Sequence, residues 1–92
     1  MNDTPLDQAN STKAIYERLT AIFREVFGNP AIVLKPGTNA ADIEGWDSFA
    51  TVSLIAAIEQ EFGIQVRTAE IQVLRDVASF SEMICAKLEA RA

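Results

Sequence analysis

Few residues of this chain have side chains suited to chemistry, and one serine stands out by its setting. Asp47 and Ser48 follow Gly45-Trp46 and begin a long apolar-rich segment that contains neither proline nor glycine. An aspartate before such a segment is a typical N-cap, which places Ser48 in the first turn of a helix. The free N–H groups and the dipole of a helix start favour an anionic group. Ser48 is therefore a candidate for carrying a phosphate ester.

The sequence contains no histidine, and this limits what a nucleophile can do. Ser-His and Cys-His mechanisms lose their usual base, so Ser48 needs another enzyme to activate it. The one cysteine, Cys85, cannot form an internal disulfide, and we expect it to be an inert small apolar residue. No Cys/His spacing indicates zinc and no glycine-rich loop indicates phosphate binding. We predict no enzyme activity and no metal site.

Length, composition and charge restrict the fold and the partners. The 92 residues, 49% of them apolar, are enough for one compact core. Thirteen acidic against eight basic residues give a net charge of −5, which disfavours nucleic acid and anionic membranes and favours basic protein surfaces. No signal or transit peptide is visible, and the apolar stretches are too short to span a bilayer. We predict a cytoplasmic monomer without a nucleic-acid or membrane partner.

The elements that position Ser48 are predicted to be helices. Residues 1–10 contain little to bury and include Pro5, so we expect a disordered leader before a domain over residues 11–92. The first helix would begin with Ser11 as its N-cap and end at Gly28-Asn29-Pro30. Its apolar residues recur at helical spacing and are Ile15, Leu19, Ile22, Phe23, Val26 and Phe27.

Residues 31–46 are predicted to form a long loop that lies on the core. Pro36-Gly37 and Thr38-Asn39 are turn sequences, and apolar residues lie on both sides of them. A strand over residues 31–35 is the alternative, but nothing else in the sequence offers it a partner. Trp46 ends this loop. We expect it to cover the bundle rather than to dock partners, because a large aromatic side chain usually buries area.

The predicted helix from Ser48 to about Phe62, which Gly63 would end, carries two apolar stripes. Only one stripe is needed to cover a core, so the other is free to meet partner proteins. The alternative is that its aromatic residue folds into the core. The predicted core stripe comprises Leu54, Ile55, Ile58 and Phe62, and the predicted docking surface comprises Phe49, Val52, Ala56 and Glu59.

Two further helices are predicted after an extended link over residues 64–67. Thr68 would cap a short helix that runs to about Leu74, with Ile71 and Leu74 pointing inward. Asp76 would cap the last helix. The predicted fold is therefore all-α, a small bundle of three main helices plus one short helix. The buried side of the last helix is marked by Val77, Phe80, Ile84 and Leu88.

The segment Asp42-Ile43-Glu44-Gly45-Trp46-Asp47-Ser48-Phe49 resembles the acyl carrier protein family, in which an Asp-Ser-Leu motif begins the second helix. The resemblance runs from about Ile32 to Leu88. It includes the order of helices, the mid-chain serine and the glutamate-rich end of the serine's helix. It implies an acyl-carrier-like bundle whose Ser48 receives phosphopantetheine from coenzyme A through a phosphopantetheinyl transferase. It also implies that Asp47 helps this transferase to recognise the serine.

The resemblance implies a carrier that holds acyl or aminoacyl groups as thioesters. Its partners would be an acyl-loading ligase or acyltransferase and downstream synthase or transferase enzymes. Phe49 replaces the usual leucine, and Ala50, Ser53 and Gln60 stand where fatty-acid carriers often have acidic residues. We therefore expect a specialised pathway, such as polyketide or secondary-metabolite biosynthesis, rather than housekeeping fatty acid biosynthesis. The alternative is a helical interaction module of the same shape without the arm.

Overall fold

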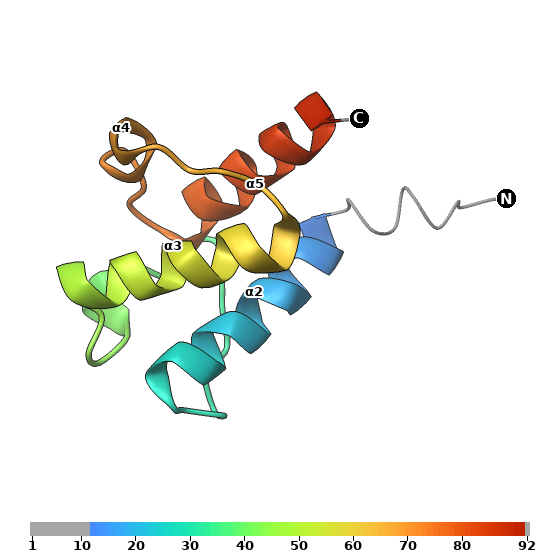
Figure 1. Ribbon diagram of the computed structural model, residues 1–92. Coiled ribbons are helices and arrows are strands. Elements are labelled where there is room, and N and C mark those ends of the chain that lie inside the picture. The colour runs from blue at the N-terminus through green and yellow to red at the C-terminus, as the bar shows by residue number, and fades with distance from the viewer. Residues whose placement is uncertain (1–11, 92) are drawn as a thin grey trace, which may run out of the picture.

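The computed structural model describes residues 12–91, and their fold is helical (Figure 1). The helices are α2 (Thr12–Phe27), the 3-10 helix η1 (Ala40–Asp42), α3 (Ser48–Phe62), α4 (Thr68–Ile71) and α5 (Val77–Arg91). The described residues form no strand beyond one isolated bridge between Asn39 and Asp76. This confirms the predicted bundle of three main helices plus a short one. The predicted leader and the cap at Ser11 lie outside the described residues.

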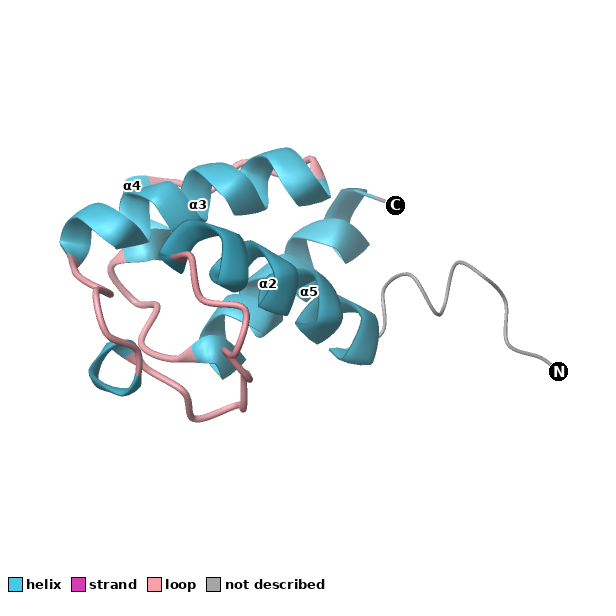
Figure 2. Ribbon diagram, turned by 90° about the horizontal axis from the view of Figure 1, so that it is seen from below, coloured by secondary structure: helices cyan, strands magenta, loops and turns pink. Residues whose placement is uncertain are grey.

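Helix α2 packs against both α3 and α5. The long loop before α3 lies at the end of the bundle opposite the start of α2 and the end of α5 (Figures 1 and 2). Ser48, the first residue of α3, therefore lies at the loop end of the molecule. The loop satisfies the first N–H groups of α5, since Val77 N–H donates to Thr38 O and Ala78 N–H donates to Pro36 O, both at 2.9 Å. This packing confirms the predicted loop over residues 31–46, except that the loop contains the 3-10 helix η1, which was not predicted.

The core contains side chains from every main helix, and the predicted core stripe of α3 is buried. Leu54 and Ile58 have no exposed surface. Three residues predicted to be buried, Val26, Phe27 and Leu88, are only partly buried and pack against the core from outside. They lie near the ends of α2 and α5, at the edge of the bundle. The buried apolar residues are Ile15, Leu19, Ile22, Phe23, Ile32, Leu54, Ile55, Ile58, Phe62, Ile64, Val77, Phe80 and Ile84.

The prediction for the short helix is wrong at both ends. Helix α4 ends at Ile71 rather than at Leu74, and its N-cap position is Arg67 rather than Thr68. The Glu70 carboxylate accepts a hydrogen bond from the Arg67 N–H at 2.8 Å and forms a 2.8 Å ion pair with Lys87 of α5. The third residue of α4, Glu70, therefore stabilises the N-terminus of this helix. Both contacts lower the pKa of Glu70, the hydrogen bond to Lys87 most strongly.

The last helix begins as predicted, with Asp76 as its cap. The Asp76 carboxylate accepts hydrogen bonds at 2.9 Å from both the N–H and the hydroxyl of Ser79. These two bonds, the backbone one first, lower the pKa of Asp76 because they favour the charged carboxylate. The first side chain of the helix, Val77, is fully buried.

Candidate attachment site

The start of α3 is held by Asp47. Its backbone is extended, with φ −118° and ψ −171°, and its carboxylate accepts a hydrogen bond from the Ala50 N–H at 2.8 Å. Its carbonyl accepts from the Thr51 N–H at 2.9 Å. Gly45 precedes this cap with φ 89°, a left-handed value that glycine adopts without a Cβ clash. The predicted N-cap is confirmed, and it places Ser48 in the first helical turn.

Ser48 is exposed, and its surroundings suit an anionic ester. Its hydroxyl makes no hydrogen bond with any described residue, so none of them is placed to act as its base. The N–H groups of Ser48 and Phe49 likewise have no partner in the part of the chain that the structure describes. Two free donors beside an exposed hydroxyl favour a negative charge at this position, and the helix dipole acts in the same direction.

The stripe predicted to dock partners faces solvent next to Ser48. Phe49 is 82% exposed and Val52 is 63% exposed, and Ala56 is also exposed. The alternative in which Phe49 folds into the core therefore does not occur. Large apolar side chains this open to solvent mark a surface suited to protein contacts. The structure thus brings Ser48, Phe49, Val52 and Ala56 together on the outer side of α3.

Glu59 has a contact that the sequence did not reveal, whereas Trp46 lies as the sequence predicted. The half-buried Glu59 accepts a hydrogen bond from the Val66 N–H at 2.9 Å, so its carboxylate also holds the link between α3 and α4. Trp46 is partly buried and covers the bundle, as expected. Its ring centroid lies 5.2 Å from that of Phe23 and 5.8 Å from that of Phe80, both in edge-to-face geometry.

Comparisons with known proteins agree with this geometry. Residues 17–84 match the family described as the phosphopantetheine attachment site. The chain belongs to the acyl carrier protein family. An acyl carrier protein of Saccharopolyspora erythraea is 28% identical over 71 residues, which cover 77% of this chain and 75% of that protein. The solution structure of a holo acyl carrier protein from Geobacter metallireducens superposes with a TM-score of 0.79 at 35% identity, covering 84% of this chain and 88% of that one.

Membership of this family confirms three predictions. The chain is a carrier, it acts through a phosphopantetheine prosthetic group, and it is not itself an enzyme. The helix start described above fits such a group, because it combines a reachable hydroxyl with two unpaired N–H donors for a phosphodiester. When attached, phosphopantetheine supplies a terminal thiol that holds an acyl group as a thioester.

The one thiol of the chain, that of Cys85, lies in surroundings that favour its protonated form. Cys85 is partly buried, and burial raises its pKa, as do the charge and the hydrogen bond of Glu89, whose Oε2 lies 3.6 Å from Sγ. A protonated thiol is a poor nucleophile, which agrees with the predicted inert Cys85. Among the described residues, no cluster of His, Cys, Asp and Glu side chains could hold a metal ion.

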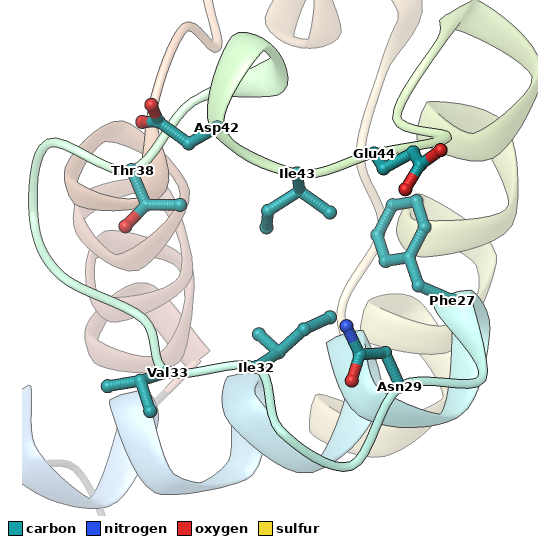
Figure 3. Close-up of a pocket in the computed structure, with 8 residues that line it drawn as sticks. All are labelled: Phe27, Asn29, Ile32, Val33, Thr38, Asp42, Ile43 and Glu44. Atoms are coloured by element: carbon teal, nitrogen blue, oxygen red, sulfur yellow. The ribbon is translucent and has the colours of Figure 1, made fainter.

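A groove between the two arms of the long loop is the feature that sequence reasoning missed. Its volume is about 570 Å³. In Figure 3, Ile32 and Ile43 point toward each other across it, and Glu44 and Phe27 lie at one side. None of the predicted site residues lines this groove. Its lining comes mainly from residues 29–33 and 38–44, on the two sides of the turn at Pro36-Gly37. The sequence predicted this turn but not the space between the segments that it joins.

Proposed function

We propose that Ser48 carries the phosphopantetheine arm of this acyl carrier protein. The observation that supports it is an exposed hydroxyl in the first turn of α3 beside two unpaired N–H groups. The other serines within residues 12–91 lack this combination. Ser81 is buried, and the Ser79 hydroxyl bonds to Asp76. Ser53 is exposed but lies beyond the first turn, where N–H groups are used inside the helix.

The attachment needs a second protein. A phosphopantetheinyl transferase would supply the base that takes the Ser48 proton. The Ser48 oxygen would then form a bond to phosphorus while the pyrophosphate bond of coenzyme A breaks and the adenosine bisphosphate leaves. The chain contributes an accessible hydroxyl, a fixed helix start through Asp47, and backbone N–H groups that favour the charged ester.

The partners follow from the carrier role. Proteins of this family work with transferases and synthases. We propose that a dedicated ligase or acyltransferase loads the arm and that downstream synthase or transferase enzymes use the load. Phe49, Val52, Ala56 and Glu59 would form the docking surface next to Ser48. Small apolar surfaces of this kind suit brief encounters better than permanent assembly.

We further propose a specialised biosynthetic pathway. It is supported by the absence of acidic side chains at Ala50, Ser53 and Gln60 on the Ser48 helix. Charge around a docking surface sets encounter rate and partner choice more than affinity. The cytoplasmic location and the monomeric state stay predictions. No helix in residues 12–91 is long and apolar enough to cross a membrane.

The test is attachment of the arm in vitro. The full chain is incubated with coenzyme A, magnesium and a broad-specificity phosphopantetheinyl transferase, and intact mass is measured. We expect the mass of one arm to be added to the wild type and to Ser53→Ala, the matched control on the same helix. Ser48→Ala should gain nothing while its circular dichroism stays helical. Modification of Ser48→Ala would refute the assignment, and an unmodified wild type would favour an interaction module without the arm.

A further inference from the structure

A hydrogen-bond relay connects the core to the turn that carries Ser48. The Trp46 indole N–H donates to the Thr51 hydroxyl at 2.9 Å. That hydroxyl in turn donates to the Asp47 carbonyl at 3.0 Å, and the same carbonyl accepts from the Thr51 N–H. Trp46 and Thr51 therefore flank Asp47 and Ser48 on both sides and are bonded to each other across them.

The relay matters because the start of α3 has little other attachment to the core. Ser48 and Phe49 are exposed, and the first fully buried side chain of α3 is Leu54, almost two turns further along. Trp46, in contrast, is packed among Phe23, Phe27 and Phe80. The relay thus ties an otherwise solvent-exposed first turn to a rigid aromatic cluster.

We propose that Trp46 and Thr51 are positioning residues for transfer of the arm to Ser48. The relay fixes the direction of the first turn, and with it the Ser48 oxygen, relative to the body of the carrier. A transferase that docks on the outer face of α3 then meets the hydroxyl in one orientation. The proposal rests on Ser48 being the attachment residue. Oriented reactants react faster because the entropy of alignment has already been lost before the chemical step.

Thr51→Val tests the relay with minimal change of shape, since it replaces a hydroxyl by a methyl group. The full-length apo protein is modified by the transferase and coenzyme A at varied carrier concentration. We expect kcat to fall about fivefold or more while KM changes less than twofold, because orientation is lost but the docking face is intact. Thr51→Ser keeps the hydroxyl and should restore most of kcat. Trp46→Phe removes the donor and should lower kcat in the same way.

Thr20→Val is the matched control. Thr20 makes the same kind of bond, from its hydroxyl to the Tyr16 carbonyl at 2.7 Å, but on α2. It should leave kcat and KM at wild-type values even if it lowers the melting temperature. Because Trp46 is the only tryptophan, its fluorescence reports the broken bond directly. We expect the emission to change in Thr51→Val and not in Thr20→Val.

The possible outcomes separate this inference from the proposed function. A wild type that gains no arm refutes the attachment site itself. If the wild type gains the arm and Thr51→Val shows the same kcat, the role of the relay is overturned while the attachment site stands. An increase in KM without loss of kcat also overturns it, since the bond would then serve docking. A fall of kcat in Thr51→Val, with recovery in Thr51→Ser and no effect in Thr20→Val, supports it.

Discussion

Helices α3 and α5 both begin after an aspartate, yet only one of the two starts is open. Asp47 and Asp76 each accept a hydrogen bond from the N–H three residues on. At α5 the first two N–H groups after Asp76, those of Val77 and Ala78, donate to the long loop. The side chain of Val77 is fully buried. At α3 the N–H groups of Ser48 and Phe49 have no partner among the described residues, and both side chains are exposed.

The difference shows which feature turns the N-terminus of a helix into an attachment site. The cap chemistry is the same, so an Asp N-cap by itself identifies only a helix boundary. What distinguishes α3 is that no other segment of residues 12–91 covers its first turn. The free donors and the exposed hydroxyl remain available to a transferase, whereas the same donors in α5 are used to hold the loop on the core.

The largest expected effect is a difference in stability between alanine variants of the two phenylalanines in these first turns. Phe80 of α5 is 1% exposed and Phe49 of α3 is 82% exposed. We expect Phe80→Ala to cost about 3–5 kcal/mol of unfolding free energy, because it leaves a cavity beside Phe23 and Trp46. Phe49→Ala should cost less than about 0.5 kcal/mol. Urea titrations measure both, and similar losses would show that the two starts are not packed differently.

Removal of the caps should separate stability from function. We expect Asp47→Ala and Asp76→Ala each to cost about 1 kcal/mol, because each leaves a helix N–H without its acceptor. Only Asp47→Ala should also slow the transfer of the arm. Thermal melts and the transferase assay measure the two effects. Equal transfer rates for both variants would mean that the Asp47 cap has no role at the site beyond the fold.

Acid should weaken the Asp76 cap at the start of α5, which the long loop covers. Hydrogen bonds from Ser79 lower the pKa of Asp76, so its carboxylate binds protons less readily in the folded than in the unfolded state. Its contribution to stability is therefore present above its ordinary pKa of 3.8 and lost as the pH falls toward the lower folded value. We expect Asp76→Asn to flatten the loss of stability below about pH 4. Glu82→Gln, which changes an exposed residue of α5, is the control. An unchanged acid profile in Asp76→Asn would contradict this.

The smallest expected effect on stability concerns the open face of α3. Ala50→Asp combined with Ser53→Glu adds the acids that fatty-acid carriers often have there. We expect the change in unfolding free energy to stay below about 0.5 kcal/mol. Loading of the holo protein by a general malonyl-transferring enzyme should become faster at low salt, through faster association. If the wild type is already loaded as fast at low salt, the proposal of a specialised pathway fails.

Local signals in the sequence determined the main elements. The apolar spacing predicted α2, α3 and α5 and the core stripe of α3, because helical periodicity acts within a few turns. Asp47 and Asp76 predicted two helix starts because a cap bonds only three residues away. The motif around Ser48 predicted the family, which the comparisons confirmed.

Contacts between distant parts of the chain decided the rest. The ion pair between Glu70 of α4 and Lys87 of α5 joins residues 17 positions apart, and no local pattern encodes it. The groove beside Ile32 and Ile43 depends on how the loop folds back. Above all, the two capped starts look alike in sequence. Only the tertiary structure shows that the loop covers the start of α5 and leaves Ser48 open, because the hydrogen bonds from Val77 to Thr38 and from Ala78 to Pro36 join residues far apart in the chain.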